Sequence, residues 1–445
     1  MLRLAVPAFA ALVSEPLFLL ADTAVVGFLG TEPLAALSVA GSVLQTVIGL
    51  CLFLAYATTA TVARRLGAGD EPGALTDGVS GLWLAGALGL LLAAATAAGA
   101  AAAIGAFDVT GAVADQAVAY LRVSAIGVPA MLVVLAATGV LRGLQDTRTP
   151  LVVIVGANLA NIVLDVALVY GAGLGLVGSA LGTVLAQGGA AVALVWVVLR
   201  RSRRAGASAR PELRGVWSAL GSGTPLLVRT ATLRVVLVLA TVVAATLPAA
   251  SLAAQQIAVT VVAVLAYGLD AVAIAGQAII GHHLGAGDVA ATRRSTRRMV
   301  WWGVGGGVVA GVGLVALSPW LPYLFTADPE VRSAATTALV VVGLVQPVSG
   351  VVFVLDGVLI GAGDGRYLAV AGLLTAVAYV PAALAVVALG GGIGWLWVAY
   401  GLWILARAAT LVWRARGTSW LRTGAVPVDA GSGGAAVAEA RDAAR

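Results

Sequence analysis

Long apolar runs, separated by short clusters of charged and turn-forming residues, follow one another along almost the whole chain. The runs are near or above the roughly 20 residues that a helix needs to cross a bilayer. Because they are long and continuous rather than short and alternating, they favour helices over barrel strands. The pattern predicts an all-α integral membrane protein with about twelve transmembrane helices, at about 4–29, 34–62, 78–106, 117–142, 149–170, 174–199, 216–246, 251–281, 299–325, 333–361, 367–389 and 393–415.

The composition excludes a soluble enzyme. Of the 445 residues, 61% are hydrophobic and only 10% are charged, whereas a soluble domain carries roughly 25% charged residues. Polar side chains this scarce cannot cover a water-facing surface, so most of the perimeter must face lipid. The formal charge of +6 comes from arginines scattered in short clusters between the apolar runs, which argues against a nucleic-acid partner.

The arginines in the loops and in the adjoining turns of the predicted spans belong almost entirely to alternate loops. One set of loops holds only Arg122 and Arg332, and the other set holds the remaining loop arginines. By the positive-inside rule the arginine-rich set is cytoplasmic, which places both termini on the cytoplasmic side. The segment 416–445 is rich in Gly, Ala and Ser and has no apolar period, so we expect a disordered cytoplasmic tail there.

An internal repeat divides the chain. The pentapeptide LGAGD occurs at 66–70 and again at 284–288, an offset of 218 residues, and the same offset relates Pro7 to Pro225, Pro129 to Pro347, and segment 139–146 to segment 357–364. The halves are then 1–199 and 216–415, joined by an arginine-rich linker at 200–215. Six spans per half predict two six-helix bundles related by internal pseudo-two-fold symmetry about the membrane normal, with a central cleft between them.

Seven ionisable residues fall inside the predicted spans, where a charge costs at least ~2.5–3.5 kcal/mol. They are Glu15, Asp22, Asp165, Arg229, Arg234, Asp270 and Asp356. The N-terminal half holds three acids and no base, whereas the C-terminal half holds two acids and two arginines. Each of these groups therefore needs a functional or structural reason to be there.

In the N-terminal half, a count of ~1.5 Å per residue allows Asp22, Asn161, Asp165 and Thr183 to meet in one layer of the membrane. Their oxygen atoms are ligands that can hold Na⁺, and two carboxylates close together in low dielectric can instead hold a proton. We interpret these residues as a cation- or proton-binding site. In the alternative interpretation the acids are neutral and hydrogen-bond neighbouring helices.

Three further polar or helix-bending residues belong to the same half. Glu15 shares a helix face with Asp22, and Asn158 shares one with Asn161, so both are candidates for contact with a substrate in the cleft. Pro7 lies beyond the first turn of the first span, where its missing hydrogen bond permits a bend. That bend is either static or changes when Asp22 takes up a proton.

In the C-terminal half, Asp270 and Asp356 lie nearer the cytoplasmic side, and Arg229 and Arg234 lie about mid-span. Three interpretations are open. Either the arginines pair with the acids as a scaffold or bind an anion, or an acid faces the cleft and attracts a cationic substrate. Asp270 and Asp356 are therefore also candidates for contact with substrate.

The sequence does not indicate an enzyme. It contains no Ser-His-Asp set, Cys-His pair, zinc-binding spacing or Walker loop, and it has only two histidines. General-base chemistry would have to rest on carboxylates. We therefore expect no catalytic residues, and no cofactor or metal other than a coupling ion, H⁺ or Na⁺.

Four stretches of the chain resemble multidrug and toxin extrusion (MATE) transporters, and within them the branch of DNA-damage-inducible protein F. They are EPLFLLADTAVVGFLG, VLRGLQDTRTPLVVIVGANLANIVLDVAL, LAAQQIAV with YGLDAVAIAGQAIIGHHLGAGD, and VLDGVLIGAGD. The resemblance covers residues 1 to about 415. It implies twelve helices in two lobes and cation-coupled efflux of organic, often cationic, compounds.

The resemblance also implies roles for particular residues. The family's N-lobe cation site falls on Asp22, Asn161, Asp165 and Thr183, and its bending proline on Pro7. Its acids of the eighth and tenth helices fall on Asp270 and Asp356. The chain departs from the branch at Phe28, where histidine is frequent, and at Glu15, where an uncharged residue is usual, which leaves the polarity of the substrate open.

Together these features predict a secondary antiporter in a bacterial plasma membrane, in which inward H⁺ or Na⁺ drives export of an organic, cationic or amphipathic small molecule by alternating access. We expect a monomer in the lipid bilayer with no nucleic-acid partner. The alternative is a flippase of related architecture that moves lipid-linked oligosaccharides, with Arg229 and Arg234 on the phosphate. A passive channel would require transport without any ion gradient.

Overall fold

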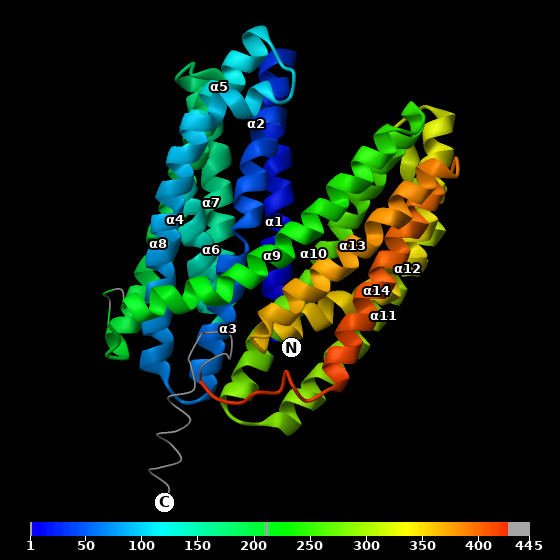
Figure 1. Cartoon of the computed structure of the whole chain (residues 1–445). Helices are drawn as coiled ribbons and strands as arrows, with labels where there is room; N and C mark the ends of the chain where they lie inside the picture. The colour runs from blue at the N-terminus through cyan, green and yellow to red at the C-terminus, as the bar shows by residue number, and fades with distance from the viewer. Residues whose placement is uncertain (1, 209, 211, 426–445) are drawn as a thin grey trace, which may run out of the picture. The chain divides into compact units, whose positions relative to one another are not determined.

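The computed structural model describes residues 2–208, 210 and 212–425 (Figure 1). The chain divides into two compact units, Leu2–Gly223, here the N-unit, and the residues from Thr224 on, here the C-unit. The predicted halves end and begin at 199 and 216, whereas the boundary between the units falls within a helix, α9, which begins in the N-unit and continues into the C-unit.

Helices make up both units. The N-unit contains α1 (Leu2–Gly27), α2 (Thr31–Leu50), α3 (Phe53–Gly67), α4 (Glu71–Gly105), α5 (Gly111–Ala125), α6 (Val128–Gly143), α7 (Arg148–Val166), a π-helical turn η1 (Ala167–Gly171) and α8 (Gly175–Arg204). After α9 (Leu213–Ala245), the C-unit contains α10 (Ala249–Gly285), α11 (Val289–Leu317), a 3₁₀ turn η2 (Leu321–Leu324), α12 (Pro329–Gly361), α13 (Gly365–Ala388) and α14 (Ile393–Arg416).

The number of membrane-crossing segments agrees with the prediction. Within the described residues, 11 helical segments are long and apolar enough to cross a membrane. The pair α5 and α6, bent by 49° at its break, brings the number to 12 if it is one span. The expected all-α membrane protein with about twelve spans is thereby confirmed, and the chain is a multi-pass membrane protein.

The repeated LGAGD motif forms the same turn in both units. Its second glycine, Gly69 (φ 79°) or Gly287 (φ 76°), has the positive φ that glycine adopts readily and that often ends a helix. The aspartate that follows, Asp70 or Asp288, accepts a hydrogen bond from a backbone N–H three residues on, at 2.9 and 2.7 Å respectively. The sequence repeat is therefore a repeat of a helix stop followed by an N-cap.

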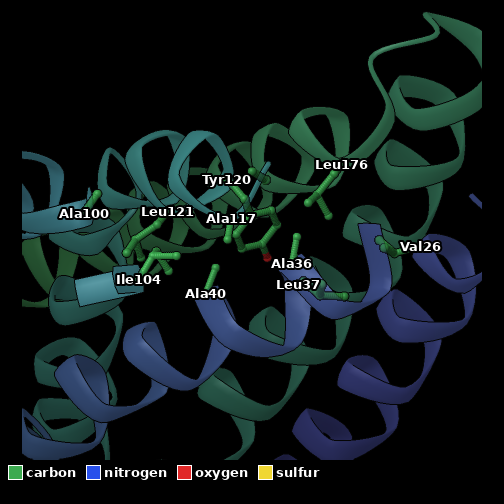
Figure 2. Packing of buried hydrophobic residues seen from close by; sticks show 11 residues of the cluster. Val26, Ala36, Leu37, Ala40, Ala100, Ile104, Ala117, Tyr120, Leu121 and Leu176 are labelled. Carbon is green, nitrogen blue, oxygen red and sulfur yellow. The ribbon is translucent and has the colours of Figure 1, made fainter. Parts of the chain in front are cut away.

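Small side chains allow the helices of the N-unit to pack closely. Figure 2 shows Ala36 and Ala40 of α2 beside Ala117 and Tyr120 of α5, and all four are buried. Because lipid tails are as apolar as leucine, close van der Waals packing between small residues holds such helices together. Tyr120 brings a hydroxyl group into this otherwise apolar cluster.

In the C-unit, α10 and α11 both pack on α12. Glycines allow the backbones of these helices to come into direct contact. A Cβ atom on Gly350 would lie 2.0 Å from the carbonyl oxygen of Gly303, and one on Gly357 would lie 2.7 Å from Cα of Ala273. Any larger residue at these positions would push the helices apart.

The chain remains packed on the C-unit after α14 ends. Trp420 is 2% exposed, and its Nε1 donates to the carbonyl oxygen of Ala415 at 3.1 Å. Gly424 N donates to the carbonyl oxygen of Leu284, at the end of α10, at 3.1 Å. Residues 417–425 thus differ from the disordered tail expected from 416 on, because Trp420 supplies an apolar anchor. The rest of that tail, 426–445, lies outside the described residues.

Candidate cation site

Three helices of the N-unit bring the predicted cation-site residues together. Asp22 lies near the end of α1, Asn161 and Asp165 lie one turn apart near the end of α7, and Thr183 lies in α8. All four side chains are buried: Asp165 is 0%, Asn161 2%, Asp22 5% and Thr183 8% exposed. The four residues and their neighbour Ser179 are called the acid cluster below.

The contacts within the acid cluster are polar throughout. Ser179 Oγ donates to Asp22 Oδ1 at 2.7 Å. Asn161 Nδ2 lies 3.3 Å from Thr183 Oγ1 and 3.5 Å from Asp165 Oδ1, to both of which it can donate. The carboxyl groups of Asp22 and Asp165 are themselves within hydrogen-bonding reach of each other. Side chains from three helices therefore converge on one pair of acids.

Two oxygen atoms of the cluster accept no hydrogen bond. Asp165 Oδ2 and Asn161 Oδ1 are both fully buried and have no donor among the described residues. A buried acceptor without a donor costs about 1–3 kcal/mol. A proton between the carboxyl groups or a cation among the oxygen atoms would remove that cost, so the residues present fit the ion that the sequence predicted.

No positive side chain among the described residues forms an ion pair with either acid. Ion pairs elsewhere in the N-unit join Arg65 to Asp70 and Asp77, and Arg201 to Asp146. Two adjacent carboxylates without a counter-charge repel each other strongly in a low dielectric. The electrostatics of the cluster therefore favour uptake of one small cation.

The backbone around Asp165 is shaped to hold its side chain. The α-helix gives way to the π-helical turn η1 two residues after Asp165, and such turns are frequent at functional sites. The hydroxyl group of Tyr170, in this turn, donates to the carbonyl oxygen of Val25 in α1. On α8, a Cβ atom at Gly182 would lie only 2.2 Å from Asp165 Oδ1. Glycine at 182 thus makes room for the carboxylate.

Sequence reasoning missed two members of this environment. Ser179 lies four residues before Thr183 on α8, and that spacing alone places both on one helix face. Tyr120 of α5 is buried (Figure 2). Its hydroxyl group interacts with Ser179 and lies near Asp22. No spacing rule relates Tyr120 to the cluster, since it lies on a helix that supplies none of the acids.

The other predicted residues of this half lie outside the acid cluster. Glu15 is exposed on α1. Asn158 Nδ2 lies 3.4 Å from both the carbonyl oxygen and Oγ of Ser14, and so links α7 to α1 two turns before Asp22. Pro7 lies inside α1, as does Pro16, and α1 runs unbroken past both.

In the C-unit, Asp356 lies between two arginines. It accepts a hydrogen bond from Arg229 Nη2 at 2.7 Å and a second from Arg407 Nη2. Arg407 also lies well inside a predicted span, 393–415, and the sequence count of seven missed it. This arrangement favours the ion-pair interpretation of Arg229 and Asp356 over contact of Asp356 with substrate.

The remaining two ionisable residues of the C-unit have different surroundings. Arg234 is exposed on α9 and has no ion-pair partner within the part of the chain that the structure describes. Asp270 is half-buried on α10. The pairing expected for both arginines is therefore observed for Arg229 only.

Comparison with known proteins identifies the family. The MatE family model matches residues 7–167 and 225–405, and the two matches begin 218 residues apart, at Pro7 and Pro225. Protein DETOXIFICATION 44, chloroplastic, of Arabidopsis thaliana is 30% identical over 93% of this chain and 81% of its own length. DNA damage-inducible protein F of Escherichia coli is 31% identical, but over 42% of this chain and 40% of its own length. The branch suggested by the sequence is thus matched over a smaller share of the chain than the plant protein.

The fold is shared with solved structures at low sequence identity. A crystal structure of MATE in the bent conformation has a TM-score of 0.86 at 21% identity and covers 93% of each chain. A MOP superfamily transporter from Pyrococcus furiosus, described as having a binding pocket of reverse polarity, has the same TM-score and identity and covers 95% of this chain and 96% of its own. The chain therefore belongs to the MatE family of multi-pass membrane transporters of small molecules, and it is not an enzyme.

Proposed function

We propose that this protein is a cation-coupled antiporter that exports organic, cationic or amphipathic compounds by alternating access. The observation that carries the proposal is the acid cluster, in which Asp22 and Asp165 lie together without a counter-charge. An inward-moving proton or Na⁺ binds there, offsets one of the two negative charges and so relieves the repulsion between the carboxylates. Efflux proteins among the relatives support the direction of transport, for example the probable multidrug resistance protein NorM of Chromobacterium violaceum, which is 26% identical over 80% of this chain.

Coupling requires that the cation distinguish between two conformations. A cation bound equally well in both would shift no equilibrium. We propose that the cluster closes around the ion, because Asp22 on α1 faces Asn161 and Asp165 on α7 and Thr183 on α8. Neutralisation of the acids then favours a different position of α1, and Pro7, which removes one helix hydrogen bond, supplies the bend.

The geometry of α1 tests the bending step. Spin labels at two exposed positions on either side of Pro7, such as Leu2 and Leu17, report its curvature. We expect their distance to change between pH 5 and pH 8 in the wild type and to stay constant in Asp22→Asn. Identical α1 geometry at both pH values in the wild type would contradict a bend that responds to the cluster.

The choice between the two coupling ions needs a transport measurement. The wild type is reconstituted in vesicles and efflux of a cationic dye is followed under a pH gradient alone and under a sodium gradient alone. We expect one gradient to drive efflux and the other to fail. Transport that proceeds at the same rate with no gradient would indicate a passive channel and end the proposal.

The alternative function, a flippase for lipid-linked oligosaccharides, needs both Arg229 and Arg234 for phosphate. Arg229 already donates to Asp356, which weakens the alternative, although the exposed Arg234 remains suited to an anion. Substitution Arg234→Gln separates the two functions, since we expect dye efflux to persist and a flippase to lose its substrate.

We also propose that the protein is a monomer in a bacterial plasma membrane, related to the branch of DNA-damage-inducible protein F.

A further inference from the structure

The first half of α11 carries a dense group of basic and aromatic side chains. Four arginines lie in its first three turns, and two tryptophans follow them. All six side chains are exposed on the C-unit. They are called the arginine–tryptophan face below: Arg293, Arg294, Arg297, Arg298, Trp301 and Trp302.

The helical repeat places these side chains on one side of α11. Thr292 and Met299 are fully buried and share the opposite side, where α11 packs on α12. The six exposed residues form two rows with the spacing i, i+4 and i+8, which are Arg293–Arg297–Trp301 and Arg294–Arg298–Trp302. In each row the tryptophan lies ~6 Å further along the helix axis than the nearest arginine, so the charged and aromatic groups occupy successive levels.

The arginines of this face have no ion-pair partner among the described residues. None of the four forms an ion pair or a side-chain hydrogen bond there, and α11 contains no acidic residue. Asp288, the acid nearest in sequence, caps the helix through the backbone N–H of Ala291. His283, at the end of α10, lies near Arg294 and supplies no negative charge. Because like charges at i and i+4 of a helix repel each other, an anion among these arginines would relieve their repulsion.

The internal repeat provides a counterpart of α11 that lacks the arginines. At the offset of 218 residues Trp301 corresponds to Trp83 of α4, and both are exposed. The four arginines correspond to Leu75, Thr76, Val79 and Ser80. In the N-unit the start of α9 covers this surface, since Glu212 N donates to Ser80 Oγ at 3.3 Å and a Cβ atom on Gly215 would lie 2.7 Å from that oxygen. The surface that the chain itself covers in the N-unit is therefore exposed and basic in the C-unit.

We propose that the arginine–tryptophan face binds the head group of an anionic phospholipid at the membrane surface. The turn before α11 belongs to the arginine-rich loops, which are expected to be cytoplasmic, and a basic cluster beside a membrane-crossing helix attracts anionic head groups there. The guanidinium groups donate to the phosphate oxygens. The inference does not rest on the transport function proposed above, since the acid cluster belongs to the N-unit.

The tryptophans favour a lipid over a soluble anion as the ligand. Trp301 and Trp302 are 69% and 42% exposed, and they lie in a segment that is long and apolar enough to cross the membrane. Tryptophan at the end of such a segment is typical of the membrane interface. A phospholipid held by the arginines would therefore place its glycerol and the first part of its acyl chains against the two indole rings.

Retention of lipid by the full-length protein tests the site. The protein is placed in nanodiscs of equal parts phosphatidylcholine and phosphatidylglycerol, released, and weighed by native mass spectrometry. We expect the wild type to retain phosphatidylglycerol preferentially and Arg297→Gln/Arg298→Gln to lose about fivefold of that preference, because each basic group near the surface adds to the attraction. The matched control is Arg148→Gln/Arg416→Gln, which removes the same charge from exposed positions at the start of α7 and the end of α14.

Two further measurements distinguish a lipid from other occupants of the face. Soluble glycerol phosphate is added to the wild type in neutral detergent, and we expect it to bind far more weakly than the lipid because it lacks acyl chains. The full-length variant Asp429→Asn/Glu439→Gln/Asp442→Asn removes the acids of the C-terminal tail. We expect this variant to retain as much phosphatidylglycerol as the wild type.

Several results would overturn the proposal. Equal retention by the wild type and Arg297→Gln/Arg298→Gln would do so, as would an equal loss in the control. Binding of glycerol phosphate as tight as that of the lipid would assign the arginines to soluble phosphate esters, and higher retention in the tail variant would assign them to the tail. Arg297→Gln alone keeps the test valid if the double variant inserts poorly, because three arginines remain to orient α11.

Discussion

The membrane-embedded acids of the two units have different neighbours, uncharged polar side chains in the N-unit and arginines in the C-unit. In the N-unit, Asp22 and Asp165 share hydroxyl and amide neighbours, and no arginine or histidine among the described residues pairs with them. In the C-unit, Asp356 lies between Arg229 and Arg407. Exposure does not explain the difference, since Asp22 and Asp356 are both 5% exposed.

This difference in neighbouring side chains implies that the acids of the two units have different functions. An acid pair without a counter-charge gains a great deal from a mobile cation, because its repulsion is relieved only when one arrives. An acid between two arginines already has its counter-charge. We therefore propose that the N-unit couples transport to the ion and that Asp356 has a structural role, since it links α12 to α9 and α14.

The largest effect is expected from removing one member of the acid pair. Asp22→Asn and Asp165→Asn should each abolish coupled efflux with expression retained, because a neutral amide no longer needs the cation. Dye efflux from vesicles under the driving gradient measures the loss. The matched control is Glu32→Gln, an exposed acid in the first turn of α2, which should transport as the wild type does. Wild-type transport by both asparagine variants would refute the site.

The corresponding change in the C-unit should damage stability rather than coupling. Asp356→Asn leaves the buried Arg407 and the half-buried Arg229 without this carboxylate, and breaking a buried pair costs about 3–5 kcal/mol. We expect a lower unfolding temperature and a lower yield of monodisperse protein, with Glu330→Gln, an exposed acid at the start of α12, unaffected. A stable Asp356→Asn variant that cannot transport would show that the C-unit acid also works on an ion or substrate.

A smaller change should displace Asp165 without removing it. In Gly182→Ala the new Cβ atom meets Asp165 Oδ1 at 2.2 Å, so the carboxylate must rotate away from Asn161. We expect the concentration of coupling ion that gives half-maximal transport to rise about fivefold to tenfold, since one ligand loses its geometry. Gly189→Ala, on the same helix with nothing within 4 Å, is the matched control. If both alanine variants needed the same concentration of coupling ion, the position of the Asp165 carboxylate would not matter for ion binding.

The sequence predicted the spans and the acid pair for separate physical reasons. Bilayer thickness fixes the length of a span, and the cost of a buried charge makes Asp22 and Asp165 conspicuous. Distance along a helix places Ser179 beside Thr183, but nothing along the chain relates Tyr120 to helices α1, α7 and α8. The second partner of Asp356 was equally hidden, because Arg407 is 51 residues distant along the chain and only tertiary packing joins the two.

The smallest effect is expected from substitutions in the repeated LGAGD turns, which are nearly alike in the two units. Asp70 and Asp288 both cap a helix, and loss of an N-cap costs about 1 kcal/mol. Asp70 also pairs with Arg65 at 2.9 Å, whereas His283 stands at the position equivalent to Arg65 in the other repeat. Asp70→Ala should therefore destabilise the protein slightly more than Asp288→Ala, by the ~0.2–1 kcal/mol of an exposed ion pair.

The pH dependence of the stability lost in Asp70→Ala tests this last comparison. The Gly73 N–H and the Arg65 guanidinium both hold the pKa of Asp70 below its usual range. The stabilisation is complete above the ordinary aspartate pKa of about 3.9 and is lost as the pH falls through the lower pKa of the folded protein. The difference in unfolding temperature between wild type and Asp70→Ala should thus be constant from pH 5 to 8 and shrink below pH 4. A difference that persists unchanged in acid would mean that Asp70 stabilises the turn through its shape, and that the ion pair with Arg65 does not make the two repeats differ in stability.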